Sequence, residues 1–179
     1  VENPLVEMPD GMYRMDLDGL EKIFAEERPA MMILCNPHNP VGIQWDAETL
    51  RHVASLARRY GVKVISDEIH GDLMLYGARH IPFCSVSDDA AAVSITFGAP
   101  SKTFNIPGLV SSWMIVRNPE LRKEFYDWMA VNEFSAPIFT ATVATEAASR
   151  NGEEWMTELL EYLQGNIDAV IDFVDRSMP

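Results

Sequence analysis

Three polar side chains of different chemistry come after three predicted strands: an amide, a carboxylate and an amine. Asn39 lies in the segment NPHNPVG, Asp67 in SDEIH and Lys102 in APSKTFNIPG. An amide can donate and accept hydrogen bonds, a carboxylate can stabilise a neighbouring positive charge, and a neutral amine can act as a nucleophile. A single aspartate after a strand is usually a helix cap, and a single lysine is usually a surface charge. The indication of a site therefore comes from the three together.

The turn that carries Asn39 is predicted to be stiff. Pro37 and Pro40 fix φ and remove two backbone donors, and Gly42 allows conformations that other residues resist. The turn follows the apolar run 31–35, which is typical of a fully buried parallel strand. Open α/β sheets place their ligands at the carboxyl ends of such strands, although the turn alone is equally consistent with a plain strand-to-helix connection.

The elements that must position these side chains alternate between strands and helices. Asp46 is a good N-cap for the second helix, and Gly61 is expected to end it. This alternation predicts an α/β fold with a doubly wound, mostly parallel sheet, helices on both faces and room for one antiparallel strand. In such a sheet the three segments meet at one edge. We expect strands at 31–35, 62–66, 91–97 and 109–116, and helices at 16–27, 47–60, 119–131, 138–150 and 153–176.

Composition describes one globular domain and excludes several classes of partner. The chain has 179 residues, of which 47% are hydrophobic and 23% charged, which is enough for a real core. Its net charge of −13 argues against binding to nucleic acid or to anionic membranes. No apolar stretch approaches the length of a membrane span. We expect a cytoplasmic protein.

Cysteine and histidine usage gives no indication of a metal site. Cys35 and Cys84 form neither a disulfide framework nor a ligand cluster, which fits a reducing compartment. His38, His52 and His80 are interpreted as loop or surface residues, and their spacing is not that of metal ligands.

The three segments together carry a family resemblance. The order N-P-x-N-P-x-G, D-E-x-H and S-K-T-F-N resembles the pyridoxal-phosphate (PLP) enzymes of the aspartate aminotransferase fold, aminotransferase class I/II. Within that family the segments, together with NGEEWMTELLEYLQGNID, are similar to the C–S β-lyase (cystathionine β-lyase) branch. The resemblance covers essentially the whole chain and implies the large-domain part of the type I PLP-dependent transferase fold.

The resemblance also implies a role for each side chain. Lys102 would form the Schiff base with the cofactor aldehyde and later move the α-proton of the substrate. Asp67 would pair with the pyridine nitrogen, and Asn39 would hydrogen-bond the phenolic oxygen of the ring. Attack on an aldehyde requires a neutral amine, and we expect desolvation at a buried strand end to favour that form of Lys102.

The sequence departs from the transaminase branch at three positions. Relatives there carry Tyr three residues after the aspartate, Ser three before the lysine and Arg eight after it, where this chain has His70, Ala99 and Val110. Ser101 is then the remaining candidate for the cofactor phosphate. His70 is a candidate contact to cofactor or substrate, and a packing role is the alternative interpretation.

The resemblance makes residues 1–179 a partial PLP-binding large domain, because family members are about twice as long. Their phosphate-binding loop and ring-stacking aromatic residue would lie upstream of Val1, and their substrate-carboxylate arginine downstream of Pro179. We therefore expect the isolated chain to be incomplete and inactive. Family sites form between two subunits, so a homodimer is implied for the full enzyme.

Three functions remain open at the level of sequence. The first is a C–S β-lyase that eliminates thiol from L-cystathionine or a similar cysteine conjugate and leaves pyruvate and ammonia. The second is an aminotransferase that acts on amino-acid substrates with the same lysine. The third is an aminotransferase-like ligand-sensing domain of a transcription regulator, which should carry a basic winged-helix segment that this sequence lacks.

Overall fold

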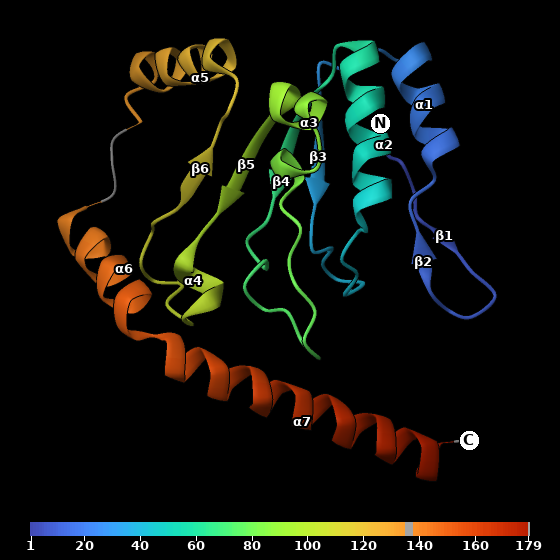
Figure 1. Cartoon of the computed structure of the whole chain (residues 1–179), viewed down its shortest axis with the longest axis vertical. Coiled ribbons are helices and arrows are strands. Elements are labelled where there is room, and N and C mark those ends of the chain that lie inside the picture. Colours follow the sequence, from blue (N-terminus) through green and yellow to red (C-terminus); the bar gives the residue numbers. More distant parts are fainter. Residues whose placement is uncertain (135–137, 179) are drawn as a thin grey trace.

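A four-stranded sheet forms the centre of the computed structural model, which describes residues 1–134 and 138–178 (Figure 1). The strand order is β3-β4-β5-β6. β3, β4 and β5 are parallel, and β6 runs antiparallel to β5. The predicted sheet with one antiparallel strand is confirmed. The four strands are β3 (Met31–Cys35), β4 (Lys63–Asp67), β5 (Ser94–Gly98) and β6 (Trp113–Ile115), and a separate small sheet pairs β1 (Val6–Glu7) with β2 (Tyr13–Arg14).

All five predicted helices are present, each within one residue of its expected bounds. They are α1 (Leu17–Glu26), α2 (Ala47–Tyr60), α5 (Pro119–Val131), α6 (Phe139–Asn151) and α7 (Glu153–Ser177). Three short helical segments add to them: the 3₁₀ turn η1 (Phe83–Ser85), α3 (Asp88–Val93) and α4 (Pro100–Thr103).

The ends of α2 follow from local chemistry. Asp46 accepts a hydrogen bond from the backbone N–H of Thr49 at 2.7 Å, and this bond lowers the pKa of the Asp46 carboxyl. Gly61 ends the helix in the left-handed region with φ of 73°, which glycine adopts without steric cost. The N-cap and C-cap expectations are both confirmed.

The strand predicted at 91–97 is wrong in its first half. Residues 88–93 form α3, whose first turn is capped by the Ser87 side chain, which accepts from the N–H of Ala90 at 3.1 Å. Three consecutive alanines with high helix propensity carry this helix, and the strand begins only at Ser94. The last strand is also shorter than the predicted 109–116. β4 ends one residue later than predicted, so Asp67 is its last residue.

One face of the sheet, here called the covered face, is sealed by α1, α2 and α3. Register pairs Leu34 with Ser66, and Val64 with Ser94, so these side chains share a face. Leu34 and Val64 pack in one cluster with apolar side chains of the three helices, and Phe24 and Leu50 are fully buried there. The main core of the protein lies on this side.

The opposite face, here called the open face, carries the alternate residues of the same strands. α5 packs over its β5 side, where Leu121 and Phe125 contact Ile95 and Phe97. At the β3 side Ile33 remains 72% exposed. Helices on both faces are therefore confirmed, but they cover the two faces unequally.

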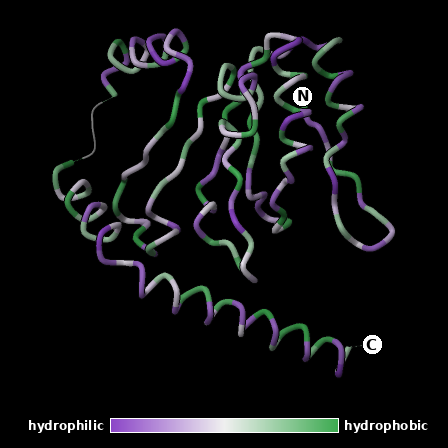
Figure 2. The backbone as a smooth tube through the Cα atoms, in the orientation of Figure 1, coloured by the Kyte–Doolittle hydropathy of each residue, from purple (hydrophilic) through white to green (hydrophobic). Residues whose placement is uncertain are grey.

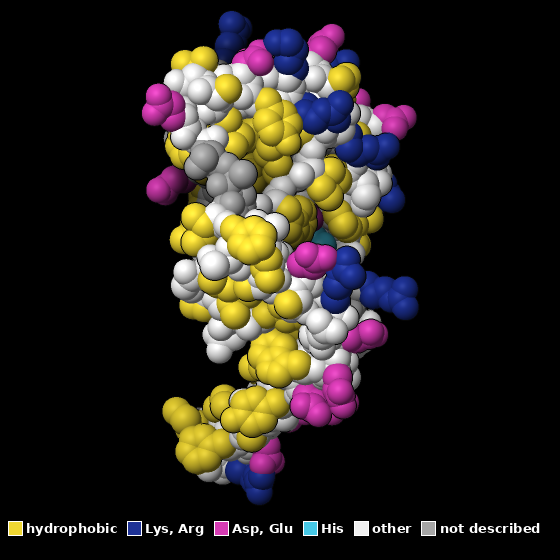
Figure 3. Space-filling model, turned by 90° about the vertical axis from the view of Figure 1, so that its left-hand side faces the viewer, with side chains coloured by type: hydrophobic (Ala, Val, Ile, Leu, Met, Phe, Trp, Pro, Cys, Tyr) yellow, Lys and Arg dark blue, Asp and Glu magenta, His cyan; other side chains and the backbone are white. Residues whose placement is uncertain are grey.

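The C-terminal helices extend away from the sheet (Figure 1). None of the described side chains of α7 is buried, although hydrophobic and hydrophilic stretches alternate along it (Figure 2). Aromatic side chains of α6 and α7 such as Phe139, Trp155 and Tyr162 are exposed. Figure 3 views the molecule from the side of α5 and α6, and hydrophobic side chains gather along this side. Across residues 1–134 and 138–178 the structure contains no helix long and apolar enough to cross a membrane.

Candidate functional site

The carboxyl ends of β3, β4 and β5 lie side by side. The register aligns Cys35 with Asp67 and Asp67 with Phe97. The chain stays hydrogen-bonded just past the strands, because the N–H of Asn36 donates to Asp67 O at 2.9 Å and that of Glu68 donates to Phe97 O at 2.8 Å. The three segments chosen from sequence therefore begin at one edge of the sheet, which is where parallel sheets bind ligands.

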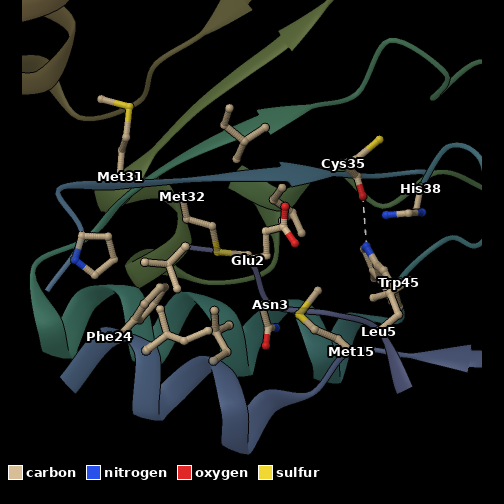
Figure 4. A pocket seen from close by; sticks show the side chains of 16 residues that line it. Glu2, Asn3, Leu5, Met15, Phe24, Met31, Met32, Cys35, His38 and Trp45 are labelled. Atoms are coloured by element: carbon tan, nitrogen blue, oxygen red, sulfur yellow. Dashed lines mark hydrogen bonds between the residues drawn. The ribbon is translucent and has the colours of Figure 1, made fainter. Parts of the chain in front are cut away.

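The first amide of NPHNPVG has a structural role that the sequence reasoning missed. Asn36 is fully buried; its Nδ2 donates to Ile81 O at 3.0 Å and its Oδ1 accepts from the N–H of Trp45 at 3.4 Å. The indole N–H of Trp45 closes the turn by donating to Cys35 O at 3.0 Å (Figure 4). These contacts fix both ends of the turn.

The second amide faces outward from this fixed turn. Asn39 is exposed, and its backbone N–H donates to the Cys35 sulfur at 3.4 Å. Its side-chain amide makes no hydrogen bond with the residues that the structure describes. Gly42 has φ of 75°, as expected from its place in the turn. The turn thus holds the backbone of Asn39 and leaves its exposed side-chain amide available to a ligand.

Asp67 and Glu68 are adjacent in sequence but lie in different surroundings. Asp67 is half-buried, and its Oδ1 accepts from the N–H of Ile69 at 3.2 Å. It forms no ion pair within 1–134 and 138–178. A carboxylate with free acceptor capacity at this edge could stabilise a protonated ring nitrogen.

The Glu68 carboxylate is already fully engaged. Only 4% of the residue is exposed, and its Oε1 accepts from Ser66 Oγ and from the N–H of Phe83, both at 2.8 Å. Its Oε2 lies 2.6 Å from His80 Nε2. His80 lies in a loop, as interpreted from the sequence, but it is half-buried there and pairs with Glu68, which the sequence analysis did not predict. The alternation of side chains beyond Ser66 is a signal for this arrangement, because it directs Glu68 to the covered face, where a carboxylate needs donors.

His70 and Asn39 line the same cavity of about 550 Å³, together with Leu73, Tyr76 and Ile167. The cavity therefore extends from the edge of the sheet to α7, where the Tyr76 hydroxyl donates to Asp168 at 2.8 Å. A second cavity, of about 560 Å³, lies beside β3 and the N-terminal segment (Figure 4). Its lining includes none of the five candidate site residues, whereas the lining of the first cavity includes Asn39 and His70 but not Asp67, Ser101 or Lys102. We therefore assign the site to the first cavity and the adjoining strand ends.

Lys102 lies on the single turn of α4, four residues after the end of β5. It is exposed, so the described residues do not provide the desolvation that we expected at a strand end. Its Nζ makes no hydrogen bond or ion pair with a described residue. Ser101 beside it is half-buried, whereas Val110 is 87% exposed and offers no charge for an anion.

The described residues contain no group of three or more His, Cys, Asp or Glu side chains that could hold a metal ion. The chemistry available at the edge of the sheet is therefore that of Asn39, Asp67, His70, Ser101 and Lys102: an amide, a carboxylate, an imidazole, a hydroxyl and an amine.

Comparison with known proteins identifies one family. Residues 4–176 match the family Aminotransferase class I and II. The whole chain is 42% identical to cystathionine beta-lyase PatB of Bacillus subtilis, of which it spans 46%, and 98% of it is 34% identical to protein MalY of Escherichia coli, of which it spans 44%. The PLP-bound C-S lyase of Staphylococcus hominis in complex with the inhibitor L-cycloserine superposes over the whole chain and 44% of its own length, with a TM-score of 0.91 and 35% identity. The chain thus spans less than half the length of these relatives.

Proposed function

Because the chain belongs to the aminotransferase class I and II family, we propose that it carries the PLP-binding core of a C–S β-lyase. The proposed reaction is β-elimination from L-cystathionine or a similar cysteine conjugate, which gives a thiol, pyruvate and ammonia. The observation that carries the proposal is that the segments bearing Asn39, Asp67 and Lys102 all leave the carboxyl ends of three neighbouring parallel strands. The 42% identity to cystathionine beta-lyase PatB supports the choice of a lyase.

The donor set fits pyridoxal phosphate. When bound, this cofactor supplies an aldehyde for a covalent link to an amine and a ring that withdraws electrons. Lys102 Nζ would make that link and would later accept the proton from the substrate Cα. The Asp67 carboxylate would favour the protonated form of the ring nitrogen, since an anion favours the charged form of its neighbour. The Asn39 amide would hydrogen-bond the phenolic oxygen of the ring.

The cofactor phosphate has one candidate partner here, the hydroxyl of Ser101, because Ala99 and Val110 have no donor side chain. In this proposal residues 1–179 are part of the large domain, and the remaining phosphate and carboxylate ligands belong to other segments of the protein. The comparison supports this, since the relatives are about twice as long as the chain. The full enzyme is proposed to be a cytoplasmic homodimer that acts on an amino-acid substrate.

An aminotransferase is the second candidate, and the family itself includes this activity. Both reactions begin with removal of the Cα proton by Lys102. They differ in what Lys102 would do next: in a lyase the thiol would leave Cβ, whereas in a transaminase Lys102 would give the proton back at a different carbon.

One experiment separates the two candidates. The protein in its full natural length is loaded with pyridoxal phosphate and incubated with L-cystathionine, and pyruvate and free thiol are measured. A parallel reaction contains an amino acid and a 2-oxoacid. Equal release of pyruvate and thiol that disappears in Lys102→Ala supports the lyase. Amino-group transfer without thiol release would contradict it in favour of the transaminase.

A further inference from the structure

The helix that carries Lys102 is too short to fix its own position. α4 has four residues and no side-chain N-cap, and its turn is closed by the N–H of Phe104, which donates to Pro100 O at 2.9 Å. The N–H of Ile106 continues the turn by donating to Ser101 O at 3.0 Å. An isolated turn of this length is not stable, because helix nucleation fixes several residues for one hydrogen bond. Contacts from elsewhere must therefore hold it.

One such contact joins α4 to the loop after β4. Thr103, the residue after Lys102, is only 5% exposed, and its Oγ1 donates to Asp72 Oδ2 at 2.8 Å. A buried hydroxyl without a partner is costly, so this bond strongly favours the observed position of Thr103. Thirty-one positions separate the two residues. The bond is therefore tertiary and independent of the helix.

The loop that presents Asp72 is itself rigid. The N–H of Gly71 donates to Glu68 O at 2.9 Å, and the carboxylate of Glu68 is held against His80. A Cβ at Gly71 would lie 2.9 Å from His80 Cδ2, so glycine is what allows the ring to approach. The turn thus carries Asp67 and His70 on the same fixed backbone as Asp72.

We infer that Asp72 is a positioning residue that sets the place of Lys102 through its hydrogen bond with Thr103. The bond couples the turn that carries Asp67 to the helix that carries Lys102, so the backbone of Asp67 and the backbone of Lys102 are held relative to each other. The chemical role of Lys102 rests on the proposed function, whereas the coupling itself is a property of the fold. Asp72 acts here as a hydrogen-bond acceptor for Thr103.

Two substitutions at Thr103 test the coupling in the protein of full natural length. Thr103→Val removes the hydroxyl at nearly constant volume, and Thr103→Ser keeps it. The first measurement is hydrogen exchange of the Phe104 and Ile106 amides without cofactor. The second is the rate at which Lys102 is trapped by borohydride after addition of pyridoxal phosphate, read by peptide mass spectrometry.

The expected result is a selective effect of Thr103→Val. Loss of one hydrogen bond should speed exchange of both amides, and slow trapping of Lys102, by roughly five- to tenfold. Thr103→Ser should stay within about twofold of the unmodified protein, because the acceptor and the donor both remain. Asp72→Ala should reproduce the effect of Thr103→Val, and the double variant should be no worse than either, since both remove the same bond.

Three outcomes would each overturn the coupling. The first is unchanged amide exchange in Thr103→Val, and the second is an equal effect of Thr103→Val and Thr103→Ser. The third is an effect of the double variant that equals the sum of the two single effects. Should Thr103→Val fail to fold, Asp72→Ala decides by the same exchange measurement. Absence of trapping on Lys102 in the unmodified protein would instead count against the proposed function, and the exchange data would still decide the coupling.

Discussion

The two faces of the sheet differ in what they do with similar side chains. On the covered face the Glu68 carboxylate is 4% exposed and is bonded to a hydroxyl, a backbone N–H and an imidazole. Toward the open face the Asp67 carboxylate is half-buried and accepts one backbone N–H. The face toward which the side chain points therefore decides whether a carboxylate stabilises the fold or remains available for chemistry.

The same division applies to the two amides of the first turn. Asn36 is fully buried and bonded on both sides, whereas Asn39 is exposed with its side-chain amide unbonded among the described residues. Substitutions at engaged positions should therefore reduce the free energy of unfolding, and substitutions at available positions should reduce cofactor binding or turnover.

The largest effect is expected for Lys102→Ala in the full-length protein. The variant should lose covalent attachment of pyridoxal phosphate and all measurable turnover, because Lys102 is the only lysine in the segment 99–110 that follows β5. Its free energy of unfolding should change by no more than about 0.5 kcal/mol, since the side chain is exposed. Borohydride trapping, enzyme assays and urea unfolding without cofactor measure the three quantities. A cofactor that remained attached would refute the assignment.

Asp67→Asn should slow turnover by roughly 10²- to 10³-fold while leaving the cofactor bound. The amide cannot hold the proton on the ring nitrogen by charge, so Cα–H removal loses its electron sink. Single-turnover kinetics and cofactor titration separate the two effects. Near-normal turnover would show that a different group holds that proton, and the engaged state of Glu68 makes that residue a poor substitute.

Glu68→Ala should lower the free energy of unfolding by about 3 kcal/mol, because it leaves the Ser66 hydroxyl, the Phe83 N–H and the His80 ring without their acceptor. Urea unfolding of the cofactor-free protein measures this loss. Asp67→Ala is the matched control and should cost less than about 1 kcal/mol, since only one hydrogen bond is lost. Equal losses at the two positions would erase the distinction between the faces.

Asn39→Ala should weaken cofactor binding by about tenfold, the value of one hydrogen bond, without altering the unfolding curve. Asn36→Ala should do the reverse and lower stability by about 2 kcal/mol, because it leaves buried groups unpaired. Cofactor titration and urea unfolding on both variants complete the comparison. Loss of stability in Asn39→Ala would mean that the exposed amide supports the turn.

The smallest effect concerns Asp46, which caps α2 on the covered side. A hydrogen bond from the N–H of Thr49 lowers its pKa below the ordinary value of 3.8, so folding is favoured while the carboxyl is ionised. That stability is present above about pH 4 and is lost as the pH falls through the lowered pKa. Asp46→Asn keeps a capping oxygen without the charge.

The difference in stability between the unmodified protein and Asp46→Asn should be at most about 1 kcal/mol at pH 7 and should shrink as the pH falls below 3.8. Urea unfolding between pH 7 and pH 3 measures it. A difference in stability that stays constant over this pH range would show that the charge on Asp46 does not contribute to the stability that the cap provides.

Sequence reasoning found those parts of the fold that short-range chemistry determines. The cap at Asp46, the stop at Gly61 and the three segments at one edge follow from local residue types and strand periodicity. It assigned residues 91–93 to a strand instead of to α3, because the run 90–93 of three alanines and a valine suits either a helix or a strand. The pairing of Glu68 with His80 and the bond from Thr103 to Asp72 join residues 12 and 31 positions apart. Strand alternation indicates that Glu68 needs a donor on the covered face, but which residue supplies it depends on the tertiary fold.

The position of Trp45 gives this protein an intrinsic optical reporter. Its indole is 4% exposed and bonded to the turn that holds Asn39, whereas Trp113, Trp128 and Trp155 are all more than 40% exposed. A water-soluble quencher such as iodide should therefore suppress the emission of the exposed indoles and leave that of Trp45 largely intact. Changes in the turn beside the strand ends would then be visible in the residual fluorescence, without any added label.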